Sequence, residues 1–121
     1  MTEHFNGLTP AEDERLAMLA EECAEVIKIV SKIQRHGYES WHPDDPLMTT
    51  NREMLRREIT DIAAVTSAMS NCGDIKTFTI SETVDAWNRK LRYAHHQKRP
   101  LTDTANAPER EAANNYEWQK Y

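Results

Sequence analysis

Two pairs of acidic residues have a spacing that suits the binding of a metal ion. Glu22 and Glu25 occur in one segment with a periodic apolar pattern, and Glu58 and Asp61 occur in a second. Residues three apart on a helix lie one turn apart on the same side. At about 100° per residue, Glu58 falls within the apolar arc of its segment and Asp61 falls at its margin. We therefore expect these acids to face inward.

Four carboxylates in a partly dry cleft repel one another unless a cation or a proton compensates their charge. Oxygen ligands favour Mg²⁺ over zinc, with Mn²⁺ as a possible substitute, and a water held by such an ion can attack a substrate. The predicted metal ligands are Glu22, Glu25, Glu58 and Asp61. In the alternative interpretation these are ordinary surface acids, with Lys28 near the first pair and an arginine beside Glu58. The occurrence of both pairs on two facing helices favours the metal site.

Three helices are expected to position these acids. The first begins at a capping box formed by Thr9 and Glu12, with Pro10 in its first turn, and ends at Gly37. Its apolar positions recur every three or four residues, as in an amphipathic helix. These positions are Leu16, Leu19, Cys23, Val26, Ile27, Val30 and Ile33.

A loop over residues 38–50, which contains Trp41, separates the first helix from the second. The second helix is expected to start near Asn51 and to end at the sequence Asn71-Cys72-Gly73. Its predicted apolar face consists of Leu55, Ile59, Ile62, Val65, Thr66 and Met69.

The third helix follows a second capping box, formed by Thr79 and Glu82, and is expected to continue to Pro100. Its apolar positions are Val84, Trp87, Leu91 and Ala94. Residues 100–121 are expected to form a linker and an extension, with a short helix from Pro108. The predicted fold is therefore all-α and like a four-helix bundle, completed by oligomerisation, in one domain over residues 1–121 with its core at about 8–99.

The bulk properties of the chain exclude several classes of protein. Its 121 residues correspond to one domain, and 39% hydrophobic and 29% charged residues with 3 glycines indicate a folded, helix-rich protein. A net charge of -5 argues against a polynucleotide partner. No apolar run approaches the roughly 20 residues that span a membrane, so no membrane partner is expected. The two distant cysteines, Cys23 and Cys72, suggest reduced thiols and a cytoplasmic location.

The residues Glu21-Glu22-Cys23-Ala24-Glu25 and Glu58-Ile59-Thr60-Asp61 resemble the two half-motifs of MazG-like, all-α nucleoside triphosphate pyrophosphatases. The similarity covers approximately Leu8 to Arg99. It implies magnesium bound by the four acids and cleavage between the α and β phosphates of an NTP or dNTP. The products would be a nucleoside monophosphate and pyrophosphate, and the role would be to trim a nucleotide pool in a homodimer or homotetramer.

The same resemblance implies roles for residues outside the four predicted ligands. Glu21 is the predicted catalytic base that orients the attacking water. Asn88 corresponds to an asparagine near the nucleotide in the family. Beside it, the basic residues Arg89, Lys90 and Arg92 are predicted to bind the substrate because cationic side chains complement phosphate charge. Trp41, in a loop that is longer than in the family, is predicted as a further nucleotide contact. A second hypothesis stays open, in which a helical dimer uses the same pocket as a nucleotide sensor or adaptor without catalysis.

Overall fold

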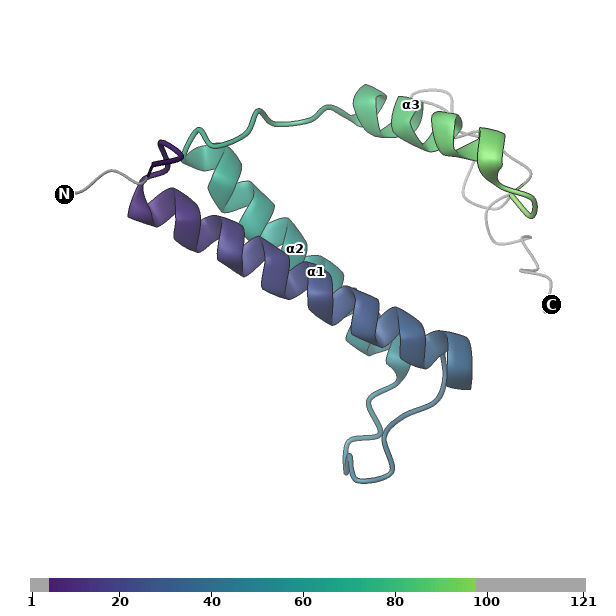
Figure 1. Ribbon diagram of the computed structural model, residues 1–121. Coiled ribbons are helices and arrows are strands. Elements are labelled where there is room, and N and C mark those ends of the chain that lie inside the picture. The colour runs from purple at the N-terminus through teal and green to yellow at the C-terminus, as the bar shows by residue number, and fades with distance from the viewer. Residues whose placement is uncertain (1–4, 98–121) are drawn as a thin grey trace. The chain divides into compact units, whose positions relative to one another are not determined.

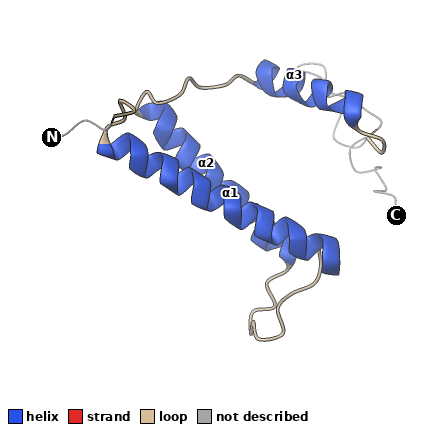
Figure 2. Cartoon of the chain, viewed as in Figure 1, coloured by secondary structure: helices blue, strands red, loops and turns tan. Residues whose placement is uncertain are grey.

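The computed structural model describes residues 5–97 of the chain. This range forms three α-helices, α1 (Pro10–His36), α2 (Asn51–Asn71) and α3 (Ile80–Lys90), and one 3-10 helix, η1 (Leu91–Tyr93) (Figure 1). Apart from an isolated bridge between Trp41 and Thr50, residues 5–97 contain no β-structure (Figure 2). The predicted all-α class is therefore confirmed. The described residues divide into two compact units with the boundary between Thr77 and Phe78, and each unit is described separately below.

Helix α1 begins and ends where its sequence predicts. The Thr9 side chain accepts a hydrogen bond from the Glu12 amide at 3.2 Å, and the Glu12 carboxylate accepts one from the Thr9 amide at 2.8 Å. These bonds satisfy two amides at the first turn that have no partner within the helix. At the other end, Gly37 has φ 86° and ψ 170°, a conformation that essentially only glycine adopts, and it ends the helix.

A loop held by internal hydrogen bonds connects α1 to α2. The Asp45 carboxylate accepts hydrogen bonds from the amides of Leu47 and Thr49, and these bonds hold the pKa of Asp45 below its ordinary value. At the base of the loop, the buried Asn51 side chain donates to the carbonyl oxygen of Gly37 at 3.0 Å. The end of α1 is thereby joined to the start of α2, and both predicted boundaries are confirmed.

Helices α1 and α2 lie side by side and run in opposite directions (Figure 1). Arg15, near the start of α1, donates two hydrogen bonds to the carboxylate of Asp74, which follows α2. The Nε–Oδ2 distance is 2.5 Å and the Nη2–Oδ1 distance is 2.8 Å. Between the helices, Ile29 and Met69 are the buried hydrophobic residues of the described chain.

The predicted apolar face of α1 is wider than the surface that α2 covers. Several residues that the periodicity placed on this face are exposed, including Leu16 at 41% and Ile27 at 70%. On α2, Ile59 is likewise 52% exposed. These side chains are exposed within this unit because a single neighbouring helix covers only part of each apolar arc.

In the second unit, α3 begins at the predicted capping box. The Glu82 amide donates to the Thr79 hydroxyl at 3.1 Å, and the Thr79 amide donates to the Glu82 carboxylate at 2.7 Å. The predicted end at Pro100 is wrong, because the α-helix ends at Lys90 and tightens into η1. Ala94 then has an extended backbone, and weak helix formers surround it.

The proposed helix from Pro108 lies outside the described residues. The expectation of a single domain over residues 1–121 stays a prediction. Within residues 5–97, no helix has both the length and the apolar character that crossing a membrane requires.

Candidate metal centre

Three of the four predicted metal ligands come together between α1 and α2. One carboxylate oxygen from each of Glu22, Glu58 and Asp61 lies within 4.8 Å of the other two. Glu22 lies near the middle of α1, whereas Glu58 and Asp61 lie one turn apart on α2. Glu22 and Glu58 are half-buried and Asp61 is exposed.

The positions of these acids follow from the way each helix packs. Glu22 precedes the buried Ile29 by two turns, and Glu58 precedes the buried Met69 by three, so both acids lie on the face that meets the other helix. A step of three residues falls about 60° short of a full turn. Asp61 is therefore rotated away from α1 and is more exposed than Glu58.

The electrostatic environment of Glu22 reflects this crowding of negative charge. Partial burial raises the pKa of Glu22 above its ordinary value of 4.5. The charges of Asp61 and Glu58 raise the pKa further, followed by those of Glu21 and Glu25. A cation among these groups would oppose all of these effects, because it stabilises the ionised carboxylates.

The donor atoms fit a hard divalent cation. In octahedral Mg²⁺ sites the ligand distances are about 2.0–2.1 Å, so the oxygens of one ion lie at most about 4.2 Å apart. The carboxylate oxygens of Glu22, Glu58 and Asp61 lie within 4.8 Å of one another, a few tenths of an ångström more than this value. A small change of side-chain rotamer brings them close enough to share one ion. The all-carboxylate donor set also favours Mg²⁺ or Mn²⁺ over a soft metal.

The arginines of α2 make their ion pairs elsewhere. Arg56 and Arg57 lie 3.8 and 3.6 Å from the carboxylate of Glu53, and Arg52 lies 2.7 Å from that of Glu39. The alternative interpretation, in which an arginine neutralises Glu58, therefore gains no support from the ion pairs of this helix.

Glu25 and Glu21 lie beside the three-residue group without belonging to it. Glu25, the fourth predicted ligand, follows Glu22 by three residues and is therefore rotated about 60° away from α2. It is exposed for the same reason as Asp61, which is rotated away from α1. Glu21, the predicted catalytic base, is exposed as well. Both are near enough for their charges to raise the pKa of Glu22. Their roles as ligand and base stay predictions.

Trp41 lies in the loop between the two helices and is 46% exposed. Its backbone pairs with that of Thr50, eight residues before Glu58, which corresponds to about 12 Å along α2. Its contact with a nucleotide stays a prediction.

The remaining predicted substrate-binding residues belong to the second unit. Asn88 is half-buried on α3. Arg89 and Lys90 are exposed in the last turn of α3, and Arg92 is exposed in η1. Their roles in binding a substrate stay predictions.

Arg15 and Asp74 are not part of any motif or predicted site in the sequence. Their ion pair aligns α1 with the end of α2, and their side chains are only 20% and 10% exposed. The two residues are 59 positions apart in the chain, so no local pattern links them. Only the hydrophobic pairing of the helices brings them together.

Comparison with known proteins adds one finding to this geometry. The family model of the MazG nucleotide pyrophosphohydrolase domain matches residues 11–98, well over half of the chain, and this range includes all of the predicted site residues. No curated protein matches the chain. No solved structure matches it either.

Proposed function

The chain belongs to the MazG nucleotide pyrophosphohydrolase family, and on this premise we propose that it hydrolyses nucleoside triphosphates in a reaction that depends on Mg²⁺. Water and an NTP or dNTP are converted to the nucleoside monophosphate and pyrophosphate, and Mn²⁺ can substitute for Mg²⁺. The proximity of the Glu22, Glu58 and Asp61 carboxylates is the observation that carries this proposal. The proposed role is to trim a nucleotide pool.

In this proposal, Glu22, Glu58 and Asp61 hold the cation, and Glu25 completes the set from one turn along α1. When bound, Mg²⁺ supplies positive charge that stabilises the leaving pyrophosphate and favours deprotonation of water. The half-buried positions of Glu22 and Glu58 limit their access to water and strengthen their attraction to a cation. The exposed position of Asp61 leaves the centre open to a substrate on one side.

Glu21 is the proposed general base. It is adjacent to Glu22 in sequence, and its charge acts on the Glu22 carboxylate. An exposed carboxylate in this position accepts a proton from an attacking water and passes it to solvent.

Asn88, Arg89, Lys90 and Arg92 are the proposed contacts to the nucleotide and its phosphates. Guanidinium and ammonium groups complement phosphate charge, and an amide both donates and accepts hydrogen bonds. Trp41 is proposed to stack on the base, since an exposed indole offers a flat apolar surface.

The release of pyrophosphate from a panel of NTPs and dNTPs, with and without Mg²⁺ or Mn²⁺, tests this proposal. Glu58→Gln and Asp61→Asn are each expected to lower kcat/KM at least about 100-fold, since even the residues that only support metal ligands contribute about 10–100-fold. Glu14→Gln is the matched control, because Glu14 is an exposed acid on α1 two turns before Glu22. Full activity in correctly folded Glu58→Gln and Asp61→Asn would refute the assignment of the centre.

The same assay separates catalysis from the sensor or adaptor hypothesis. A sensor binds nucleotide with Mg²⁺ present but releases no pyrophosphate from any member of the panel. Binding measured by calorimetry under the assay conditions therefore distinguishes a non-catalytic protein from an enzyme whose substrate is missing from the panel.

A further inference from the structure

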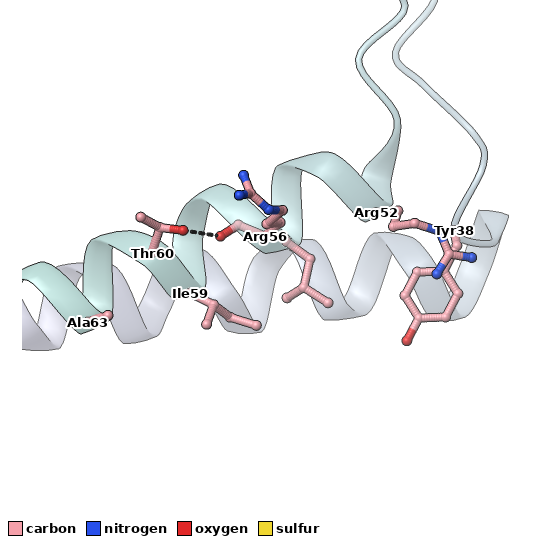
Figure 3. Close-up of a pocket in the computed structure, with 7 residues that line it drawn as sticks. Tyr38, Arg52, Arg56, Ile59, Thr60 and Ala63 are labelled. Atoms are coloured by element: carbon pink, nitrogen blue, oxygen red, sulfur yellow. Dashed lines mark hydrogen bonds between the residues drawn. The ribbon is translucent and has the colours of Figure 1, made fainter. Parts of the chain in front are cut away.

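The first half of α2 carries two neighbouring rows of side chains, each with a spacing of four residues. The apolar row consists of Leu55, Ile59 and Ala63. The second row, which contains two arginines, consists of Arg52, Arg56 and Thr60. Together with Tyr38, the two rows line an open groove of about 500 Å³ (Figure 3). From its first residue to its last, the groove extends about 16 Å along α2, or about three helical turns.

This groove and the acidic cluster lie on opposite flanks of α2. At 100° per residue, Ile59 lies about 160° around the helix from Asp61. The buried Met69, which faces α1, lies about 80° from each of them. A molecule in the groove therefore leaves the carboxylates accessible, and its binding does not depend on the proposed catalytic activity.

The two arginines of the groove are held at its rim and can still donate hydrogen bonds. The Arg52 guanidinium lies 4.3 Å from the centre of the Tyr38 ring and donates to the Glu39 carboxylate at 2.7 Å. Arg56 lies 3.8 Å from the Glu53 carboxylate, beyond the hydrogen-bond range of about 2.7–3.2 Å. The side chains of Arg52 and Arg56 are 62% and 75% exposed. Because a guanidinium has several N–H donors, both can bind further carboxylates.

The shape of the groove fits a helix. Figure 3 shows Arg52 and Tyr38 at one end of the groove and Ala63 at the other. A row of side chains on one helix packs into the groove between two such rows on another. Ile59 is 52% exposed beside the arginines, and apolar side chains gathered at a charged rim mark an interaction site. We propose that this groove binds an acidic, amphipathic helix of another protein, whose apolar row lies on Ile59 and whose carboxylates pair with the two arginines.

A second copy of the groove does not offer this charge complementarity. If two α2 helices met antiparallel about a twofold axis through the groove, the arginine rows of both copies would lie on the same side and repel each other. In a parallel pair, each arginine row would face the apolar row of the other copy and lose water without gaining a counter-charge. An acidic partner helix instead places its carboxylates opposite Arg52 and Arg56 and its apolar side chains opposite Ile59.

The first test is isothermal titration calorimetry of the full-length protein with a synthetic helical peptide. The peptide has about 14 residues, with leucines in one row and glutamates in the next, and a hydrocarbon staple on the opposite face maintains the helix. A matched peptide has lysine in place of each glutamate. The glutamate peptide is expected to bind at least about tenfold more tightly, because the arginines attract it and repel the lysine peptide. Equal affinities, or no binding of the glutamate peptide at millimolar concentration, would overturn the proposal.

Reversal of one charge in the groove gives the second test. Arg56→Glu is expected to weaken binding of the glutamate peptide at least about tenfold and to strengthen binding of the lysine peptide, a reversal that loss of structure does not produce. The matched control is Arg57→Glu, because Arg57 also lies near Glu53 but does not line the groove. This control is expected to keep the preference for the glutamate peptide. Circular dichroism confirms that both variants keep their helices. A helical Arg56→Glu variant with the wild-type preference contradicts the proposal.

The place of binding is tested by nuclear magnetic resonance of the isotope-labelled, full-length protein. Addition of the glutamate peptide is expected to shift the backbone amide signals of Leu55, Ile59 and Ala63, which follow the groove along α2. The signal of Glu22, on α1, is expected to shift little. Shifts confined to residues outside the groove would show that the peptide binds elsewhere and would refute the assignment of this surface.

Discussion

At the scale of single residues, the acidic cluster follows from a simple relation between spacing and burial. Two acids three residues apart differ by about 60° around the helix, so one acid of each pair meets the other helix and its partner turns toward water. Glu22 and Glu58 are the half-buried members, and Glu25 and Asp61 are the exposed ones. The sequence therefore predicts which side of each helix carries the acids, but not which of the four carboxylates approach one another. Side-chain rotamers and the pairing of the helices decide that.

The raised pKa of Glu22 predicts how stability depends on pH in the absence of divalent ions. The folded protein binds the proton of Glu22 more tightly than the unfolded chain does. Above the raised pKa, ionisation of Glu22 therefore lowers the free energy of unfolding. This effect disappears below the ordinary pKa of 4.5, where Glu22 is protonated in both states. Glu22→Gln is therefore expected to be more stable than the wild type at pH 7, with the difference approaching zero near pH 4.

Urea unfolding at a series of pH values with EDTA present measures this difference. Glu14→Gln serves as the control, since it removes an exposed acid of the same helix outside the cluster. If Glu22→Gln were less stable than the wild type at pH 7, the repulsion among these carboxylates would not significantly lower the free energy of unfolding.

The ion pair between Arg15 and Asp74 depends on pH with the opposite sign. The hydrogen bonds from Arg15 hold the pKa of Asp74 below its ordinary value of 3.8. The stabilisation is present above 3.8 and is lost as the pH falls through the lowered pKa. Asp74→Asn is expected to lower the melting temperature by a few degrees at pH 7 and to have little effect near pH 2. Thermal unfolding of both proteins between pH 2 and 7 gives the comparison, and a difference that does not change with pH would argue against this role.

At the scale of helices, local signals predicted the boundaries well wherever a specific hydrogen bond or backbone conformation sets them. The capping boxes at Thr9 and Thr79 and the stop at Gly37 are present in the structure. The end of α3 was predicted at Pro100 and lies near Lys90, because no capping residue or glycine marks it in the sequence. Helix is lost through Leu91–Tyr93 although Leu91 and Arg92 are strong helix formers, so local propensity does not predict this boundary.

The backbone of Gly37 provides a test of how α1 ends. A side chain at this position would meet no atom within 4 Å, so any effect of Gly37→Ala comes from the backbone conformation alone. The positive φ of 86° is unfavourable for alanine, and we expect a loss of about 1–3 kcal/mol in the free energy of unfolding. Gln34→Ala, three residues earlier and exposed, is the control and is expected to change stability by less than about 0.5 kcal/mol. Similar values for the two variants in urea unfolding would show that the chain ends α1 equally well without glycine.

At the scale of the whole molecule, periodicity identified the apolar faces but not what covers them. The apolar arcs on α1 and α2 are each wider than the surface that one neighbouring helix covers. The side chains of Leu16, Ile27 and Ile59 are therefore exposed. The sequence predicts that oligomerisation completes the bundle, because three main helices are too few to enclose a deep core.

If the homodimer expected from the sequence is the folded form, stability depends on protein concentration. When folding and association are coupled, a tenfold increase in concentration adds about 1.4 kcal/mol per dimer. For two copies of the described residues 5–97, about 190 residues in all, this corresponds to a rise of about 3–6 °C in melting temperature. Scanning calorimetry over a hundredfold range of concentration is expected to show two such steps for the wild type and for Lys28→Glu. Ile27→Glu is expected to melt at a constant, lower temperature, since its unfolding is that of a single chain. A constant melting temperature for the wild type would mean that the exposed apolar side chains of α1 do not stabilise the fold through a second copy.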